Sequence, residues 1–447
     1  MSLSEFEARL QAAVGTPSTP SVAYGIVRGD KTLLLGAAGF ANRENQVAAT
    51  SKTSYSQASI TKPITATGVM LLAERGLVDL DAPIEKYLGG QTLTGKAGSS
   101  REATVRRVAD HSAGLALHYQ FYYADEPFAR LPFAETVHRY GKLFSPPGER
   151  HQYSNLGYGL LDELISNVSG MPYERFMTEE IFEPLGMTGS SIGQREGAAI
   201  AYGPDVVYPA YDFDHPGGSA AYASVEDLLA FAQFHLGLGP DLFSLKARKV
   251  MAEPTIMIDS LRGYGFGWGT TDRSGRRIVQ HTGGMGGVST ILRLVPELDL
   301  FIVVLVNGES DLPSKAADEA LAILDPLPSE KEFPPPSPQP IPDDFKKKWS
   351  GVIETHEGKL PFILDLAQNL AVLNGQESAL EELRWANGRL AAVFDGDVQT
   401  EDASRRPYRL HLNLGHSDAG LQGAVTAVTK PGGRLGNALS YWTELRS

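Results

Sequence analysis

Three short motifs carry residue types that could do chemistry together. They are Ser59-Ile60-Thr61-Lys62, Tyr153-Ser154-Asn155 and His281-Thr282-Gly283, in this order along the chain. A serine hydroxyl is a poor nucleophile at neutral pH unless a neighbouring base removes its proton. A lysine three residues further on lies on the same face of a helical turn, so Lys62 can reach Ser59. The motifs together predict acyl transfer through a covalent acyl-enzyme on Ser59.

The second and third motifs supply the other groups that this reaction needs. The phenol of Tyr153 can act as a general base or pass a proton to the leaving group. Asn155 has both a donor and an acceptor, enough to hold Lys62 and a substrate amide. The stretch from His281 to Gly287 is rich in glycine, which lets a substrate approach a strand edge closely. We expect the N–H groups of Ser59 and Gly284 to form an oxyanion hole.

Each motif alone also has a purely structural interpretation. A Ser-x-x-Lys pattern occurs by chance in a chain this rich in serine, a tyrosine can cap a loop, and a glycine run can be a flexible loop. Aromatic residues can pack in the core, or they can line an apolar substrate pocket. As pocket candidates we take Tyr119 and Tyr122, within the aromatic stretch from Tyr119 to Tyr123.

Composition excludes several classes of protein. The 447 residues carry a net charge of −13, which disfavours nucleic acid and anionic membrane surfaces as partners. There is no cysteine, and the ten histidines are scattered, so neither a disulfide, a metal site nor a cofactor is predicted. No apolar run approaches the roughly 18 residues of a membrane helix. Residues 1–14 read as an amphipathic helix with a capping box at Ser4 and Glu7 rather than as a leader, so we expect a cytoplasmic protein.

The motifs lie in a region where strands bracket helices. Residues 21–27 with 32–39, and residues 288–295 with 300–307, have the pattern of two hairpins. Helices are predicted over 64–75, 156–168 and 224–236, the last capped by Ser224 and Asp227. Pro63 follows Lys62 directly, so Ser59 should lie at the mouth of its helix, in a 3₁₀ turn. The predicted fold class is α+β, an antiparallel sheet flanked by helices.

A proline-rich segment divides the chain. Residues 326–342 contain eight prolines in seventeen positions, which is typical of an extended linker. Short strand-like runs separated by Gly, Asn and Asp follow, and they predict a small all-β barrel or sandwich. We therefore expect a hydrolase domain at 1–325, a linker at 326–342 and a small all-β domain at 343–447.

With these flanks, the chain resembles the serine β-lactamase and penicillin-binding protein superfamily. It is most similar to the class C-like branch, which includes family VIII esterases and D-aminopeptidases. The resemblance covers about residues 5–325 and rests on the order, spacing and flanks of the motifs. The shared pieces are the Ser59 motif running into residues 63–88, His111 to Leu115, Phe144 to Gly148 before Tyr153, Pro184 to Met187, Gly217-Gly218, Tyr264 to Trp268 and the hairpin ending in Asn307.

The resemblance implies a β-lactamase/transpeptidase-like fold and a role for each motif residue. Ser59 would be the acylated nucleophile, Lys62 its partner, Tyr153 the general base and Asn155 a substrate-orienting residue. Thr282 and Gly283 would lie along the substrate. His281 takes the place of a lysine that binds the carboxylate of a β-lactam, and a neutral histidine would bind it less well. Histidine here is common among the esterases and D-aminopeptidases. Many relatives also carry a lipocalin-like C-terminal barrel, which fits residues 343–447.

The sequence therefore predicts a serine hydrolase that cleaves carboxylic esters and needs no cofactor or metal. Two alternatives remain open. One is an amide-cleaving member of the same group, such as a D-aminopeptidase, a peptidase or a weak β-lactamase. The other is a binding or sensor protein that keeps the fold without turnover. The expected partner is a small-molecule ester or amide, with neither nucleic acid nor a membrane, and a homo-oligomer stays open.

Overall fold

A nine-stranded antiparallel sheet is the centre of the N-terminal region in the computed structural model, which describes residues 1–326, 339–417, 420–431 and 434–447. The strand order is β11-β12-β13-β14-β15-β16-β1-β2-β3, so the first strands of the region pair with its last. Both predicted hairpins are present, with β1 beside β16 in the middle of the sheet. The strands are β1 (Ser21–Arg28), β2 (Lys31–Asn42), β3 (Val47–Ala48), β11 (Ile256–Met257), β12 (Arg262–Tyr264), β13 (Gly269–Arg273), β14 (Arg276–Met285), β15 (Val288–Val295) and β16 (Leu300–Val306).

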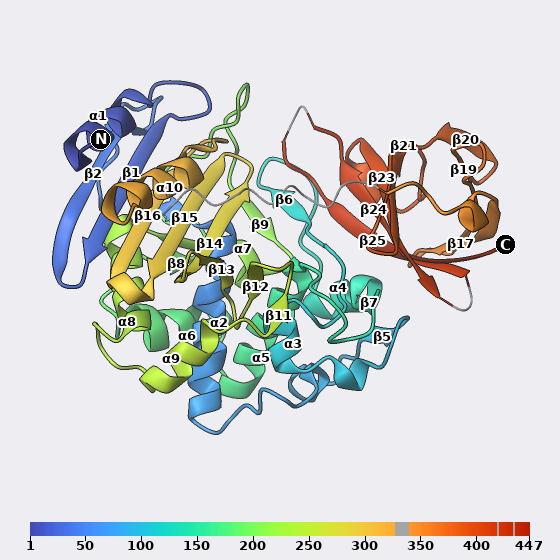
Figure 1. The fold of residues 1–447 in the computed structure, drawn as a ribbon, viewed down its shortest axis with the longest axis horizontal. Helices are drawn as coiled ribbons and strands as arrows, with labels where there is room; N and C mark the ends of the chain where they lie inside the picture. The colour runs from blue at the N-terminus through green and yellow to red at the C-terminus, as the bar shows by residue number, and fades with distance from the viewer. Residues whose placement is uncertain (327–338, 418–419, 432–433) are drawn as a thin grey trace.

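Helices cover both faces of this sheet, as Figure 1 shows. On one face, α1 (Leu3–Ala12) and α10 (Leu312–Leu324) bury Phe6, Leu10 and Leu321 against β1, β15 and β16. On the other face lies a larger group of helices, with α8 against β1 and β16. All of β16 is buried because both of its faces are covered. The larger group includes α2 (Thr61–Glu74), α3 (Val105–Ala109), α4 (Phe133–Tyr140), α5 (Asn155–Ser169), α6 (Tyr173–Met177), α7 (Pro216–Ser219), α8 (Val225–Leu236) and α9 (Leu245–Met251).

The helix ends show where local signals were sufficient. Ser224 and Asp227 form the expected capping box of α8. At the N-terminus the box is made by Ser2 and Glu5, so the prediction of Ser4 and Glu7 is wrong. Both pairs have the same spacing, but the earlier start adds the backbone hydrogen bond from Phe6 to Ser2 and lengthens the helix.

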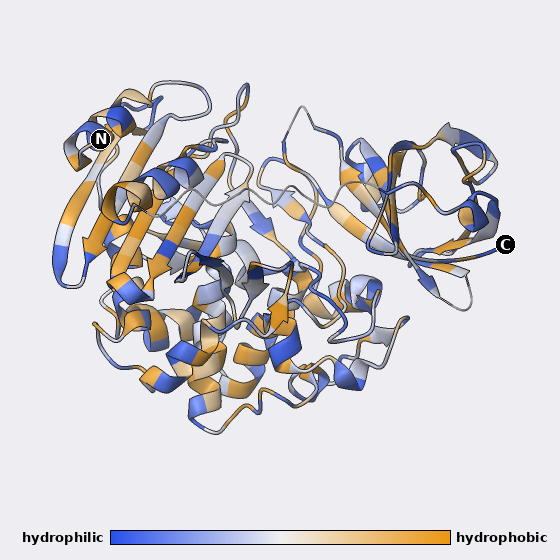
Figure 2. Ribbon diagram, in the orientation of Figure 1, coloured by the Kyte–Doolittle hydropathy of each residue, from blue (hydrophilic) through white to orange (hydrophobic). Residues whose placement is uncertain are grey.

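The C-terminal region forms a nearly closed nine-stranded antiparallel barrel. Its order is β20-β19-β18-β17-β25-β24-β23-β22-β21, and three of these strands, β20, β21 and β25, were not predicted from the sequence. Hydrophobic residues fill the interior of the barrel. They also predominate in the central strands of the first sheet (Figure 2). The strands are β17 (Lys348–Glu354), β18 (Lys359–Asp365), β19 (Leu370–Leu373), β20 (Gln376–Ala379), β21 (Glu381–Ala386), β22 (Arg389–Phe394), β23 (Tyr408–Ser417), β24 (Gly420–Thr429) and β25 (Ala438–Arg446).

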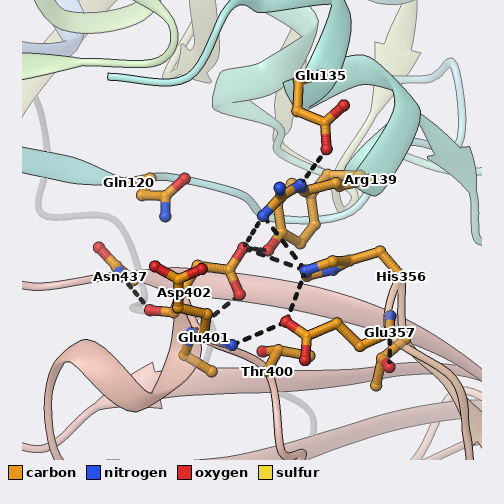
Figure 3. A network of polar contacts seen from close by, with 12 residues as sticks. Gln120, Glu135, Arg139, His356, Glu357, Thr400, Glu401, Asp402 and Asn437 are labelled. Atoms are coloured by element: carbon orange, nitrogen blue, oxygen red, sulfur yellow. Dashed lines mark hydrogen bonds and ion pairs between the residues drawn. The ribbon is translucent and has the colours of Figure 1, made fainter. Parts of the chain in front are cut away.

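The barrel contacts the N-terminal region through a buried polar network around Asp402 (Figure 3). Its carboxylate accepts from the hydroxyl of Tyr140 and lies 3.5 Å from Arg139, both on α4. Phe144 packs on Trp442 beside this network, with ring centroids 6.0 Å apart. Most of the predicted linker, residues 327–338, lies outside the described residues. We propose that residues 1–325 and 343–447 are separate domains that dock through this interface.

Candidate active site

Ser59 lies in a 3₁₀ turn, Ala58–Ile60, that leads directly into α2. Ala58 has a φ of +45°, in the left-handed region that a non-glycine residue occupies only at a cost of about 1–3 kcal/mol. Pro63 is the third residue of α2, within the first turn, where a backbone N–H has no partner inside the helix. The proline is therefore compatible with the helix, and Ser59 is held at its mouth as predicted.

Lys62 is completely buried and makes three polar contacts through its amine. The Nζ atom lies 3.0 Å from Ser59 Oγ, 2.7 Å from Asn155 Oδ1 and 2.9 Å from the carbonyl oxygen of Gly218. Burial lowers the pKa of Lys62 well below its ordinary value. A neutral amine has two hydrogens and one lone pair. It can donate to Asn155 and Gly218 and accept the hydroxyl hydrogen of Ser59.

Tyr153 approaches Ser59 from the segment that enters α5. Its hydroxyl lies 2.9 Å from Ser59 Oγ and donates to it. Burial raises the pKa of Tyr153 above its ordinary value, so the phenol stays protonated at neutral pH. Ser154 caps α5 by accepting from the N–H of Gly157, and this places Asn155 as the first helical residue. The local capping geometry thus presents Tyr153 and Asn155 to Ser59 and Lys62.

His281 lies behind this group and does not line the cleft in front of Ser59. Its Nδ1–H donates to the carbonyl oxygen of Thr282 at 2.8 Å, so its Nε2 accepts from the hydroxyl of Tyr264, also at 2.8 Å. Burial, with a smaller effect of Lys62, lowers the pKa of His281 to about 3. The histidine is therefore neutral, and the structure does not bring it to the surface where a substrate would contact it.

The glycines after His281 lie along the edge of the Ser59 turn. Gly284 lines the same cleft as Ser59, whereas Thr282 and Gly283 do not line it. Gly283 faces the backbone before Ser59, and a Cβ atom there would lie 2.2 Å from the carbonyl oxygen of Gln57. Glycine is needed at this position because β14 approaches the Ser59 turn too closely for a side chain.

The cleft in front of Ser59 has a volume of about 690 Å³ and is lined by both regions of the chain. Tyr119 and Phe121 form part of an aromatic wall together with Tyr208. Tyr122 is buried elsewhere and its hydroxyl donates to Gln120, so the structure does not place it in the cleft. The barrel contributes another part of the wall, from the end of β24 and from the segment between β24 and β25. Its described lining residues are Val428, Thr429, Lys430, Pro431, Arg434, Leu435 and Gly436.

Several residues of the site were missed by the sequence reasoning. His215 lines the cleft, and its Nδ1 lies 2.6 Å from Asp214, which also contacts His118. Burial alone would raise the pKa of Asp214, but the two histidines outweigh it and lower that pKa. The Gly217-Gly218 pair was noted only as a family feature, although Gly218 holds Lys62. No local signal marks the barrel segment, because pairing of Tyr119 with Ala438 brings it to the cleft.

The described part of the chain offers neither a metal site nor a membrane-spanning helix. No group of three or more His, Cys, Asp or Glu side chains could hold a metal ion there. Within the same residues, no helix combines the length and apolarity needed to cross a membrane.

A buried lysine, a tyrosine and a partly buried serine that contacts both, on this α+β fold, define a serine hydrolase superfamily. The Beta-lactamase family model matches residues 6–325, and the chain belongs to that family. Penicillin-binding protein 4* of Bacillus subtilis is 27% identical over 286 residues, 58% of this chain and 61% of its own length. The human putative beta-lactamase-like 1 is 28% identical over 363 residues, 75% of this chain and 71% of its own length. The chain thus spans only about three fifths of the Bacillus relative.

Solved structures share the fold at lower identity. The octameric penicillin-binding protein homologue from Pyrococcus abyssi has a TM-score of 0.65 and 21% identity, covering 99% of this chain and 100% of that one. SurE has a TM-score of 0.67 and 21% identity, and the match covers 98% of this chain and 97% of that one. The hydrolase EstCE1 covers 71% of this chain and 98% of its own, with a TM-score of 0.61 and 18% identity. The first two matches extend over the barrel, so the two-part architecture is shared.

Proposed function

We propose that this protein is a carboxylic ester hydrolase that acts through an acyl-enzyme on Ser59. The observation that carries the proposal is the position of the Ser59 hydroxyl between the amine of Lys62 and the phenol of Tyr153. Membership of the Beta-lactamase family and the fold shared with EstCE1, described as a hydrolase with promiscuous acyltransferase activity, support it.

The pKa directions assign the proton transfers. Neutral Lys62 accepts the proton of Ser59 as Oγ attacks the ester carbonyl carbon, and the N–H groups of Ser59 and Gly284 stabilise the oxyanion. The ester C–O bond then breaks, and the leaving alcohol takes a proton from Tyr153. The ammonium of Lys62 then returns a proton to the phenolate of Tyr153, so that both groups regain their starting protonation states. Water then attacks the acyl-enzyme with the same proton transfers, which releases the carboxylic acid and restores Ser59. The family resemblance implies Tyr153 as the base, but its raised pKa favours Lys62 in that role.

The third motif supports esters over β-lactams. A β-lactam carboxylate is best bound by a fixed positive charge, and buried His281 is neutral. The aromatic wall of Tyr119, Phe121 and Tyr208 suits an apolar acyl or alcohol group.

One observation favours the amide-cleaving alternative. Glu309 lines the cleft, and its Oε1 accepts from the hydroxyl of Tyr208 at 2.9 Å and the N–H of Gly287 at 3.3 Å. A carboxylate held in this way can bind the ammonium group of an amino-acid amide. A D-stereospecific amidohydrolase from Streptomyces shares the fold, with a TM-score of 0.59.

The test compares three substrate classes with one purified protein. Turnover of 4-nitrophenyl acetate, a D-amino-acid amide and a chromogenic cephalosporin is measured for the wild type and for Ser59→Ala. We expect the ester to be cleaved fastest and the variant to be inactive. A fluorophosphonate should add to Ser59, as intact-mass spectrometry will detect. Faster amide cleavage would favour the amide-cleaving alternative. The absence of both turnover and a fluorophosphonate adduct would indicate a sensor protein.

Self-association is a further part of the proposal, supported by the octameric Pyrococcus homologue. Light scattering after size-exclusion chromatography measures the mass directly. A species at the chain mass of 48.2 kDa would contradict it.

A further inference from the structure

A second cavity opens beside the cleft, between the barrel and the segment that carries Tyr153. Its volume is about 440 Å³, and residues of β22, β23 and β24 line one side. Leu117, Tyr153 and Val428 line both this cavity and the cleft in front of Ser59. The two cavities therefore adjoin at these three residues. We call the second cavity the basic groove.

The charge of the basic groove is opposite to that of the protein. Arg150, Arg384 and Arg389 line it together with His151 and His411, and none of its lining residues is acidic. The whole chain carries a net charge of −13, so three arginines around one cavity that has no carboxylate in its lining are not explained by composition. Such a concentration of positive charge attracts anionic ligands.

Two of the three arginines, Arg150 and Arg389, have no ion-pair partner among the described residues. Arg389 donates from Nε to Asn413 Oδ1 at 2.7 Å and from Nη2 to the carbonyl oxygen of Asn413 at 3.0 Å. Arg150 donates from Nη2 to Gln152 Oε1 at 2.5 Å, while its buried Nε has no partner. Both guanidinium groups are thus oriented by neutral groups, with donors left over.

Placing these two cations together is unfavourable unless something binds them. Burial, and then repulsion from Arg150, lower the pKa of Arg389 to about 10. Glu149 is the acidic group whose charge acts on both arginines, and it lines a neighbouring cavity that shares Arg150 and Arg389 with the groove. Arg384 is 3.8 Å from Glu382 at the exposed edge of β21. A bound oxyanion would relieve the repulsion and satisfy the free donors.

We propose that the basic groove binds an anionic oxygen group, a carboxylate or a phosphate, on the substrate whose ester bond is cleaved at Ser59. This inference rests on the proposed ester hydrolysis and narrows its substrate class to esters with an anionic end. The planar guanidinium groups of Arg150 and Arg389 bind two oxygens of that end, and the rest of the substrate passes Tyr153 to the cleft. Both arginines act as specificity-determining residues.

The test measures selectivity between matched esters. The first pair places the charge on the acyl side, and we compare kcat/KM for the 4-nitrophenyl monoester of glutaric acid with that for 4-nitrophenyl butyrate. The second pair places the charge on the alcohol side and compares 4-acetoxybenzoate with phenyl acetate. We expect the wild type to prefer the charged member of at least one pair. Arg389→Gln should lower that preference about tenfold, and Arg150→Gln with Arg389→Gln should lower it further.

Arg101→Gln is the matched control, because Arg101 is exposed, lies outside the groove and makes no ion pair with the described residues. This substitution removes one positive charge, as Arg389→Gln does, but it leaves the groove intact. The preference of this variant for the charged ester should therefore equal that of the wild type. An equal fall in this variant would show a general electrostatic effect and would overturn the proposal. An unchanged preference in the double variant would overturn it as well.

A binding measurement removes the dependence on turnover and on the folding of one variant. Glutarate and inorganic phosphate are titrated calorimetrically into the wild type, Arg389→Gln and Arg150→Gln at constant ionic strength. Binding of either anion that is weakened about tenfold by one of the substitutions supports the proposal and identifies the anion. The absence of binding to the wild type, or equal binding to every variant, overturns it. If the wild type cleaves no ester, the proposed function fails, but the titration still decides whether the groove binds anions.

Discussion

Gly283→Ala tests whether the contact between β14 and the Ser59 turn controls activity. The new Cβ atom would lie 2.2 Å from the carbonyl oxygen of Gln57 and 2.2 Å from Thr290 Oγ1. Non-bonded Cβ contacts below 3.0 Å do not occur, so the strand and the turn must separate by about 0.8 Å. A misplacement of about 1 Å near reacting groups costs roughly 100-fold in rate, which corresponds to about 2.7 kcal/mol.

The assay is kcat/KM for 4-nitrophenyl acetate, with thermal unfolding measured on the same samples. Overpacking a core costs about 1–3 kcal/mol, so we also expect the unfolding temperature to fall by several degrees. Gly284→Ala is the matched control. Its Cβ has no atom within 4 Å and its N–H is retained, so stability should stay unchanged and activity should fall less than tenfold. Near-wild-type activity in Gly283→Ala, or equal destabilisation by both substitutions, would refute the reasoning.

Three further predictions concern the proton transfers and the interface. The depressed pKa of Lys62 predicts that kcat/KM rises with pH as the ammonium loses its proton. It should then stay level, because Tyr153 remains protonated. A rise of kcat/KM that continues to pH 10 would identify the phenolate as the base. Tyr153→Phe should slow alkyl ester hydrolysis about 100-fold or more, and 4-nitrophenyl esters less, since 4-nitrophenolate leaves without a proton; equal losses for both would exclude a role in leaving-group protonation. Asp402→Asn should lower the free energy of unfolding by about 1–3 kcal/mol, measured by urea denaturation, because it weakens the bond from the Tyr140 hydroxyl; an unchanged value would show that the network does not stabilise the interface.

The family, the fold class and the contact between Ser59 and Lys62 could be predicted from the sequence because their signals are local or ordered along the chain. Ser59 and Lys62 are one helical turn apart, so their contact follows from helix geometry. Strand and turn patterns at 21–39 and 288–307 gave both hairpins, since alternation and turn residues act over a few positions. The polar edge strands β20 and β21 were missed because they bury little apolar surface, and β25 was missed although it is almost entirely buried.

The character of the site depends on contacts between distant segments, which only the tertiary structure decides. The pKa of Lys62 is low because segments distant in the sequence bury its amine away from water, and no short pattern encodes that burial. His281 is turned away from the substrate by its bond with Tyr264, although its motif placed it at the cleft. The barrel wall and the basic groove exist only because the C-terminal strands dock beside Tyr153. The sequence alone determined which groups are present and the order in which they occur, whereas burial by distant segments determined their charges and what they face.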